Sequence, residues 1–332
     1  MIPVPRLSAL LAGDPRTPQE IRDAVYLAGP GAAVRRSRFW LLLLLATGIA
    51  TTGIVSDSTA TVIGAMIIAP LATPIQGIAV AIAFGELRPL LVSAATLVLA
   101  VLVVVVLAAA LSWALPELEA LRQNSQISSR VSPTLVDLVA AALTGLAGSL
   151  AISRRDIGDI LPGVAIAISL VPPLAVVGVT ADAGDWAGAA GALLLFLTNV
   201  LAIIVVGTAV FGAVRVSQGL PAPALRPAYA VVGLIAVLVV AALAVTTYHA
   251  VQLSGWQQNA RRIGSSWARQ HGEQFIAARF DGSTLVMVVE GRTDGSQDQQ
   301  LPGLLRGAVP AGTPVVVDRV SGGTDEVGDV AP

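Results

Sequence analysis

Seven apolar runs, each long enough to cross about 30 Å of hydrocarbon as a helix, constrain this chain more than any other feature. They lie at approximately 39–55, 59–84, 89–114, 134–152, 160–180, 187–213 and 228–248. Hydrophobic residues make up 55% of the chain and charged residues 12%, which leaves too little polar surface to coat a soluble globule of 332 residues. Because lipid cannot satisfy bare backbone groups, each run must be helical. The sequence predicts an all-α polytopic membrane protein with seven transmembrane helices.

Arginines near the membrane ends predict the orientation. With a cytoplasmic N-terminus, two arginines lie in short outer loops, Arg122 and Arg130. Nine lie on the inner side: Arg22, Arg35, Arg36, Arg38, Arg88, Arg154, Arg155, Arg215 and Arg226. This bias predicts a multi-pass protein of the bacterial plasma (inner) membrane, with its N-terminus in the cytoplasm. An odd number of spans then places the C-terminal domain outside the cytoplasm.

Four segments organise the chain. Residues 1–38 form a cytoplasmic segment with a short amphipathic helix, which Thr17, Pro18 and Glu20 mark as a capping box. The other segments are a transmembrane domain at 39–249, a soluble domain at 250–320 and a disordered tail at 321–332.

The soluble domain is expected to be a small α+β unit. Two apolar strands at 274–280 and 284–290 flank an Asp281-Gly282 pair, which favours a hairpin. A polar helix before them, a short helix near 297–308 and a strand at 314–320 complete the order αββαβ.

An internal repeat is indicated by a shift of 99 residues. The matched pairs include Asp57 with Asp156, Gly64 with Gly163, Pro74 with Pro173 and Gly85 with Gly184. The repeats cover about 39–115 and 133–214, and the helix at about 228–248 is unpaired. Since each unit has three spans, the second lies upside down relative to the first. Inverted repeats of this kind are typical of transporters.

Prolines interrupt the second and fifth predicted helices at corresponding repeat positions. Proline removes a backbone N–H and clashes with the preceding turn, so each helix should open near the middle of the membrane. The opened backbone must face protein or water, which favours a solute or ion site, although packing kinks are the simpler alternative. The candidate pathway residues are Pro70, Thr73, Pro74, Gln76, Ser169, Pro172, Pro173 and the buried amide Asn199.

Four charged residues near the membrane ends are candidates for gating or structural roles. Asp57 and Asp156 each precede an interrupted helix, where a carboxylate would serve as an N-cap. Arg130 and Asp137 are expected to form an ion pair at the outer rim, either with a function or as a solvated pair.

Several classes of function are disfavoured by composition. The chain has no cysteine, and its two histidines, His249 and His271, lie far apart, so no metal site or cofactor is expected. No catalytic constellation lies within the spans, which argues against an enzyme. The net charge of −1 lacks the basic excess of a nucleic-acid binder.

Paired-proline motifs and their neighbours carry a family resemblance over about 45–210. The segments are SDS at 56–58, IGAMIIAPL at 63–71, TPI at 73–75, RVSPT at 130–134, LPGVAIA at 161–167, LVPPL at 170–174 and GALLLFLTN at 191–199. Together they resemble the bacterial hydrophobic membrane family catalogued as domain of unknown function 389. The resemblance implies the fold and the membrane location, and it implies no mechanism.

The leading functional hypothesis is a channel or carrier for a small solute or ion at the two interrupted helices. The alternative is an oligomeric scaffold or sensor that presents the extracytoplasmic domain. The expected partners are the lipid bilayer and further copies of the chain, because small residues let membrane helices pack closely. Similarity of the predicted architecture to trimeric intracellular cation channels favours a trimer.

Overall fold

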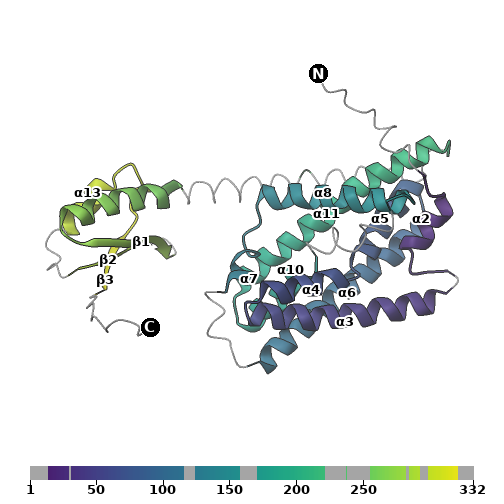
Figure 1. Ribbon diagram of the computed structural model, residues 1–332, viewed down its shortest axis with the longest axis horizontal. Coiled ribbons are helices and arrows are strands. Elements are labelled where there is room, and N and C mark those ends of the chain that lie inside the picture. The colour runs from purple at the N-terminus through teal and green to yellow at the C-terminus, as the bar shows by residue number, and fades with distance from the viewer. Residues whose placement is uncertain are drawn as a thin grey trace, which may run out of the picture. The chain divides into compact units, whose positions relative to one another are not determined.

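The computed structural model describes residues 14–29, 31–115, 124–157, 170–220, 237, 255–281, 284–291 and 298–320. The chain divides into two compact units, Met1–Thr246 and Thr247–Pro332. The first contains the apolar helices and the second contains the small sheet (Figure 1).

Most of the predicted spans are helices in the first unit. Its elements are α2 (Pro18–Val25), α3 (Ala32–Val55), α4 (Thr59–Ile68), α5 (Ala72–Phe84), α6 (Leu87–Ala114), α7 (Ser125–Ser128), α8 (Leu135–Ser153), α10 (Val171–Asp182) and α11 (Trp186–Ser217). Four helices, α3, α6, α8 and α11, are long and apolar enough to cross a membrane. The pair α4 and α5, bent by 46°, passes the same test when the two are taken together, as a broken span or a re-entrant loop. The span predicted at 228–248 and the first part of that at 160–180 lie outside the described residues.

The outer surfaces of these helices are apolar. On α6, Leu102 exposes 56% and Val106 66% of its surface, and α3 and α8 likewise expose leucines and valines. Exposed apolar area on this scale is unfavourable in water. The composition and the exposed faces together indicate a membrane-embedded unit.

Two short helices form the centre of this unit. Every residue from 74 to 83 in α5 and from 171 to 180 in α10 is buried. Each packs against both long helices α6 and α11. The long helices therefore cover α5 and α10 on several sides, which leaves their own outer faces for lipid.

Small side chains permit the close approach of these helices. A Cβ atom at Gly178 in α10 would lie 2.5 Å from the Val105 carbonyl oxygen and 2.7 Å from the Ala108 Cβ in α6. A Cβ atom at Gly207 in α11 would lie 3.0 Å from the Ala79 Cβ in α5. Each half-helix thus meets a long helix through a glycine–alanine contact, as is common in membrane bundles.

The predicted N-terminal capping box is present at the start of α2. The Thr17 hydroxyl accepts a hydrogen bond from the Glu20 backbone N–H, and the Glu20 carboxylate accepts one from the Thr17 backbone N–H. The apolar residues Ile21 and Val25 pack against α5 and α11. The short helix therefore docks on one end of the bundle, with its polar face outward.

Ion pairs fasten α2 to elements from both halves of the unit. Arg22 lies 2.8 Å from Glu86, which also accepts a hydrogen bond from the Tyr26 hydroxyl at 2.8 Å. Arg155, just after α8, pairs with Asp14 at 3.0 Å and with Glu20 at 2.7 Å. We call this set of contacts the α2 clamp, because it joins the end of α5 to the end of α8.

The second unit has the predicted αββαβ order. A helix is described over 255–270, and the strands are β1 (Gln274–Asp281), β2 (Thr284–Glu290) and β3 (Val315–Val320). A short 3-10 turn (Asp298–Gln300) and α13 (Leu301–Leu304) lie between β2 and β3. The strand β2 pairs antiparallel with β1 and parallel with β3. Alternate β2 side chains, Leu285, Met287 and Val289, join Trp267 in the core, which is the expected pattern for a sheet with one covered face.

The close contact at Gly178 gives a stability prediction. Gly178→Ala is expected to destabilise the bundle by about 1–3 kcal/mol, because the added methyl group meets backbone atoms of α6. Gly212→Ala in α11 is the matched control, since a Cβ atom there meets nothing within 4 Å. The apparent melting temperature in detergent should fall for the first variant and stay or rise for the second. Equal melting temperatures would contradict the packing described above.

The α2 clamp gives a pH prediction. A hydrogen bond from Arg155 lowers the pKa of Glu20 from 4.5 to about 2. A carboxylate whose pKa is lowered by folding stabilises fully above its unfolded pKa and loses that contribution as the pH falls. The melting-temperature difference between the wild type and Glu20→Gln should therefore be constant above about pH 5 and shrink toward pH 2.

Asp23→Asn is the control for this experiment, because Asp23 lies on the same helix and accepts a hydrogen bond only from Gln19 among the described contacts. The melting-temperature difference between the wild type and Asp23→Asn should not shrink in this way between pH 5 and pH 2. A pH-independent difference for Glu20→Gln would show that its carboxylate charge contributes nothing to the clamp.

Candidate functional site

The interruption between α4 and α5 comprises Ala69, Pro70 and Leu71. Ala69 is extended, with φ −69° and ψ 123°, as expected for a residue before proline. The chain resumes its helix at Ala72, and the Thr73 N–H donates to the Pro70 carbonyl at 3.1 Å. The α5 N-cap residue, Leu71, provides no side-chain cap. The first interruption therefore leaves backbone groups of both half-helices without a helical partner.

Pro74 does not open the helix, contrary to the expectation that both prolines of this motif do so. It is the third residue of α5, where the backbone N–H would have no partner inside the helix in any case. Pro70 alone accounts for the extended residue before it. The interruption is accordingly shorter than the motif predicted.

The second proline motif has the same place in its helix. Pro172 and Pro173 are the second and third residues of α10, and both are buried. Ser169, the polar residue predicted beside this break, lies outside the described residues. The described half of the fifth predicted span therefore begins with prolines in its first turn, as α5 does.

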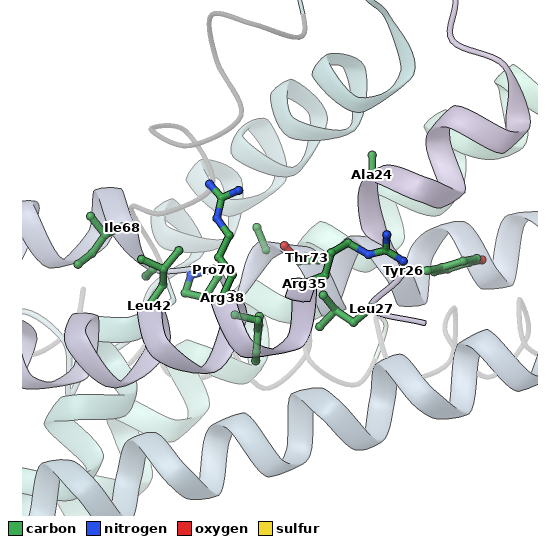
Figure 2. Close-up of a pocket in the computed structure, with 12 residues that line it drawn as sticks. Ala24, Tyr26, Leu27, Arg35, Arg38, Leu42, Ile68, Pro70 and Thr73 are labelled. Carbon is green, nitrogen blue, oxygen red and sulfur yellow. The ribbon is translucent and has the colours of Figure 1, made fainter. Parts of the chain in front are cut away.

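A cavity of about 340 Å³, which we call the Arg38 cavity, lies at the first interruption. Its walls come from the end of α2 and the chain after it, from α3, and from the break with the ends of α4 and α5 that flank it, as Figure 2 shows. Two arginines line it: Arg38 runs beside Pro70, whereas the Arg35 side chain extends toward Tyr26 and donates to the Ala28 carbonyl at 2.7 Å. The other lining residues are Ala24, Tyr26, Leu27, Phe39, Leu42, Ile68, Ala69 and Ala72. Pro70 and Thr73, both predicted from sequence, are thus brought together.

A second cavity of about 230 Å³, which we call the Asn199 cavity, lies at the start of α10. It brings together four of the residues predicted from sequence, Arg130, Asp137, Pro173 and Asn199. Ser129, Ala140 and Leu195 complete its lining. Asn199 is buried in α11, so the cavity extends from the loop before α8 to the interior of the unit.

The two cavities lie near opposite ends of α3. Arg38 is near the start of this helix, whereas the segment that leads to Arg130 is attached to its end, where Asn124 donates to the Ile54 carbonyl at 2.6 Å. Figure 1 places α2 and α7 at the two ends of α3. From Arg38 to Ile54 the helix axis rises about 24 Å, a distance close to the thickness of a hydrocarbon core.

Gln76 lies in the interior between three helices. Its side chain is fully buried on α5, and its Oε1 accepts a hydrogen bond from the Ser149 hydroxyl of α8 at 3.2 Å. The same oxygen lies over Gly207 of α11. Among the described residues, its Nε2 has no hydrogen-bond partner. The amide therefore joins α5 to the second half of the unit, and the two N–H donors of its Nε2 could serve a solute or water.

The expected ion pair between Arg130 and Asp137 is not formed within the described part of the chain. Arg130 instead donates to the Gln126 carbonyl at 2.6 Å, and burial lowers its pKa. Asp137 accepts from the Thr134 backbone N–H at 2.8 Å and so belongs to the capping box of α8. Local helix capping satisfies the carboxylate, and both residues still line the Asn199 cavity.

The sequence led us to expect that Asp57 caps the helix that follows it. The structure shows that it does not. The N-cap of α4 is Ser58, while Asp57 has a φ of 50° and accepts from the Ser125 hydroxyl at 2.7 Å. This hydrogen bond lowers the pKa of Asp57. Asp156 pairs with Arg154, and the start of the following helix lies outside the described residues. Asp57 therefore holds α7 against the end of α3.

Two arginines that line the first cavity were missed as site residues from sequence. Arg35 and Arg38 were counted only as markers of orientation, although their spacing places them on one helical face toward the break. In the described part of the chain, no group of three or more His, Cys, Asp and Glu side chains could hold a metal ion. The site can therefore offer guanidinium groups, amides and free backbone groups to a ligand.

Comparisons with known proteins place the central segment in a family. Residues 66–205 match the family described as "Domain of unknown function (DUF389)". The chain is also 34% identical over 197 residues to an uncharacterised protein of Methanocaldococcus jannaschii, a match that covers 59% of this chain and 60% of that one. No solved structure matches. The segment 66–205, which contains the first interruption and Asn199, is therefore a DUF389 domain, as its proline motifs indicated.

Proposed function

We propose that this chain is a membrane transport protein, a channel or carrier that passes a small solute or ion by way of the two interrupted helices. The observation that carries the proposal is a pair of cavities, one at the start of α5 and one at the start of α10. Interrupted helices that begin at such cavities are the usual means by which transporters offer backbone groups to a substrate.

The proposal includes the inverted repeat, and the element boundaries support it. The helices α5 and α10 start 99 residues apart, at 72 and 171, and α6 and α11 start at 87 and 186 with the same offset. The glycines that end the half-helices, Gly85 and Gly184, are also 99 residues apart, and both have positive φ, at 78° and 76°. A single shift of 99 residues therefore aligns the starts of these helices, the glycines after the half-helices and the positive φ of those glycines.

The packing of the half-helices supports the same symmetry. The shift of 99 residues converts the contact between Ala79 and Gly207 into the contact between Gly178 and Ala108. Each half-helix packs against the long helix of its own repeat and against that of the other repeat. A pseudo-twofold arrangement requires this exchange, because contacts between repeats must occur in equivalent pairs.

One lining residue of each cavity is related by the same shift. Arg38 lines the first cavity and Asp137, 99 residues later, lines the second. In an inverted pair, equivalent cavities open toward opposite sides of the membrane. With the N-terminus in the cytoplasm, the Arg38 cavity is the inner vestibule and the Asn199 cavity is the outer one. Gln76 and Asn199 are then polar groups along the path between them.

A topology experiment tests the opposite placement of the two cavities. The chain has no cysteine, so single-cysteine variants can be labelled without background. Ser129→Cys, near the Asn199 cavity, should react with an impermeant maleimide on intact cells, whereas Ser37→Cys, beside Arg38, should react only after lysis. Both serines are exposed. Labelling of both from one side would contradict the inverted arrangement.

A flux experiment tests the role of the first interruption. Pro70→Ala permits α4 and α5 to join as one helix, so flux through reconstituted liposomes should fall by roughly tenfold, the effect of about 1.4 kcal/mol on a barrier. Pro74→Ala is the matched control, because a proline in the first turn of α5 costs no helical hydrogen bond. Potassium, sodium, chloride and phosphate are the ions to assay, with melting temperatures measured alongside.

A truncation separates transport from the alternative of a scaffold. A chain that ends at residue 249 should keep its flux if the membrane unit alone transports. If the wild type and Pro70→Ala carry equal flux, the interruption at Pro70 is not part of the transport pathway. Absence of flux for every ion tested, together with loss of a partner on truncation, would favour the scaffold.

A further inference from the structure

Two segments, each just before a long helix, bind the end of the corresponding helix of the other predicted repeat. Before α3, the Arg16 backbone N–H donates to the Ser153 carbonyl of α8 at 2.9 Å. Before α8, the Asn124 side-chain amide donates to the Ile54 carbonyl of α3 at 2.6 Å. The shift that relates the repeats carries Ile54 onto Ser153. The two contacts therefore have equivalent acceptors, and they lie toward opposite ends of α3 (Figure 1).

The first of these segments, residues 14–29, is fastened by exposed groups, and we call it the N-terminal strap. Pro15 and Arg154 form an antiparallel bridge, and the Arg155 N–H donates to the Asp14 carbonyl at 2.9 Å. The two ion pairs of Arg155 in the α2 clamp join side chains that each expose between 43% and 57% of their surface. Ion pairs that water and salt can reach contribute little stability, so this fastening can open.

The second segment, residues 124–130, is fastened by buried groups, and we call it the α7 strap. Asn124 exposes only 4% and Gln126 only 5% of its surface. The Gln126 side-chain amide donates to the Thr59 hydroxyl at 2.8 Å, and its backbone N–H donates to the Asn124 side chain at 2.9 Å. Opening of this strap would break hydrogen bonds between buried amides, which is costly. Of the two straps, the N-terminal one therefore opens more readily.

The end of α8 that the N-terminal strap binds is also the part of α8 that contacts Gln76. The Ser153 hydroxyl donates to the Ser149 carbonyl one helical turn earlier, at 2.7 Å, and the Ser149 hydroxyl donates to the buried Gln76 Oε1 at 3.2 Å. The strap itself lines the Arg38 cavity through Tyr26 and Leu27. The strap thus connects one wall of this cavity to the helix end beside Gln76.

We propose that the N-terminal strap is a releasable latch on the transport path. While residues 14–16 pair with residues 153–155, the end of α8 contacts Gln76, and when this pairing opens, that end can move away from Gln76. The body of α2 stays in place, because Ile21 and Val25 remain packed against α5 and α11. The inference rests on the proposed function, since the latch regulates the path between the two cavities.

A disulfide tests whether the latch must open during transport. The main-chain hydrogen bonds of this bridge join the neighbours of Pro15 and Arg154, and the Cα atoms of such a pair lie about 4.5 Å apart. This separation suits a disulfide. In Pro15→Cys/Arg154→Cys, oxidation should lower the flux through liposomes by roughly tenfold, and reduction with dithiothreitol should restore it.

A second disulfide is the matched control for this experiment. Arg279→Cys/Val286→Cys joins the paired strands β1 and β2 in the second unit, away from the strap. Its flux should be the same before and after reduction. If the strap disulfide likewise leaves the flux unchanged, the strap does not open during transport and the proposal is wrong.

Cysteine reactivity tests the same movement without a flux measurement. Ser149→Cys gives the cysteine-free chain a single buried thiol, which a maleimide reaches only when the end of α8 moves. Adding Glu20→Gln removes one ion pair of the strap and should raise the labelling rate roughly threefold. Ala141→Cys is the matched control, because Ala141 is buried nearer the other end of α8, and its labelling rate should not change with Glu20→Gln.

The two measurements separate the latch from the proposed function. If the wild type carries no flux for any ion tested, the transport proposal fails, and the labelling of Ser149→Cys still decides whether the latch opens. Equal labelling of Ser149→Cys with and without Glu20→Gln would overturn the latch. An equal rise at Ala141→Cys would overturn it as well, because Glu20→Gln would then have loosened the whole fold.

Discussion

The requirement that backbone groups be satisfied away from water governs this structure. Pro70 holds the residue before it in an extended conformation, and three residues then separate two half-helices in the middle of an apolar span. Lipid cannot accept the freed N–H and carbonyl groups, so the break must be surrounded by protein or by a polar cavity. The burial of residues 74–83 of α5 and the presence of the Arg38 cavity both follow from this condition.

Close packing between helices and the α2 clamp stabilise the arrangement of the buried half-helices. Glycine–alanine contacts let α5 and α10 approach the long helices, where dispersion forces act at short range. At one end of the bundle, α2 joins Glu86 after α5 to Arg155 after α8. The α2 clamp therefore connects the end of α5 to the end of α8. The interior also buries polar side chains, among them Gln76, whose amide oxygen accepts a hydrogen bond from the Ser149 hydroxyl.

Much of the fold was predictable from local chemistry. The capping box at Thr17 and Glu20 and the strands beside Asp281 depend on neighbours a few residues away, and both are present as predicted. The interruption at Pro70 is equally local. Contacts between distant segments were predicted poorly: Arg130 and Asp137 satisfy their own helical turns rather than each other. A carboxylate near a helix start finds a local donor at lower entropic cost than a distant partner.

By itself, the sequence determined which segments are apolar helices, where one of them must open, and the family of the central segment. These properties follow from hydrophobic length, from the fixed φ of proline and from its missing N–H. The tertiary structure alone decided which polar groups meet, because the shift of one helix against another depends on packing over its whole length. It placed Arg38 beside Pro70, and it gathered Arg130, Asp137 and Asn199 around one cavity.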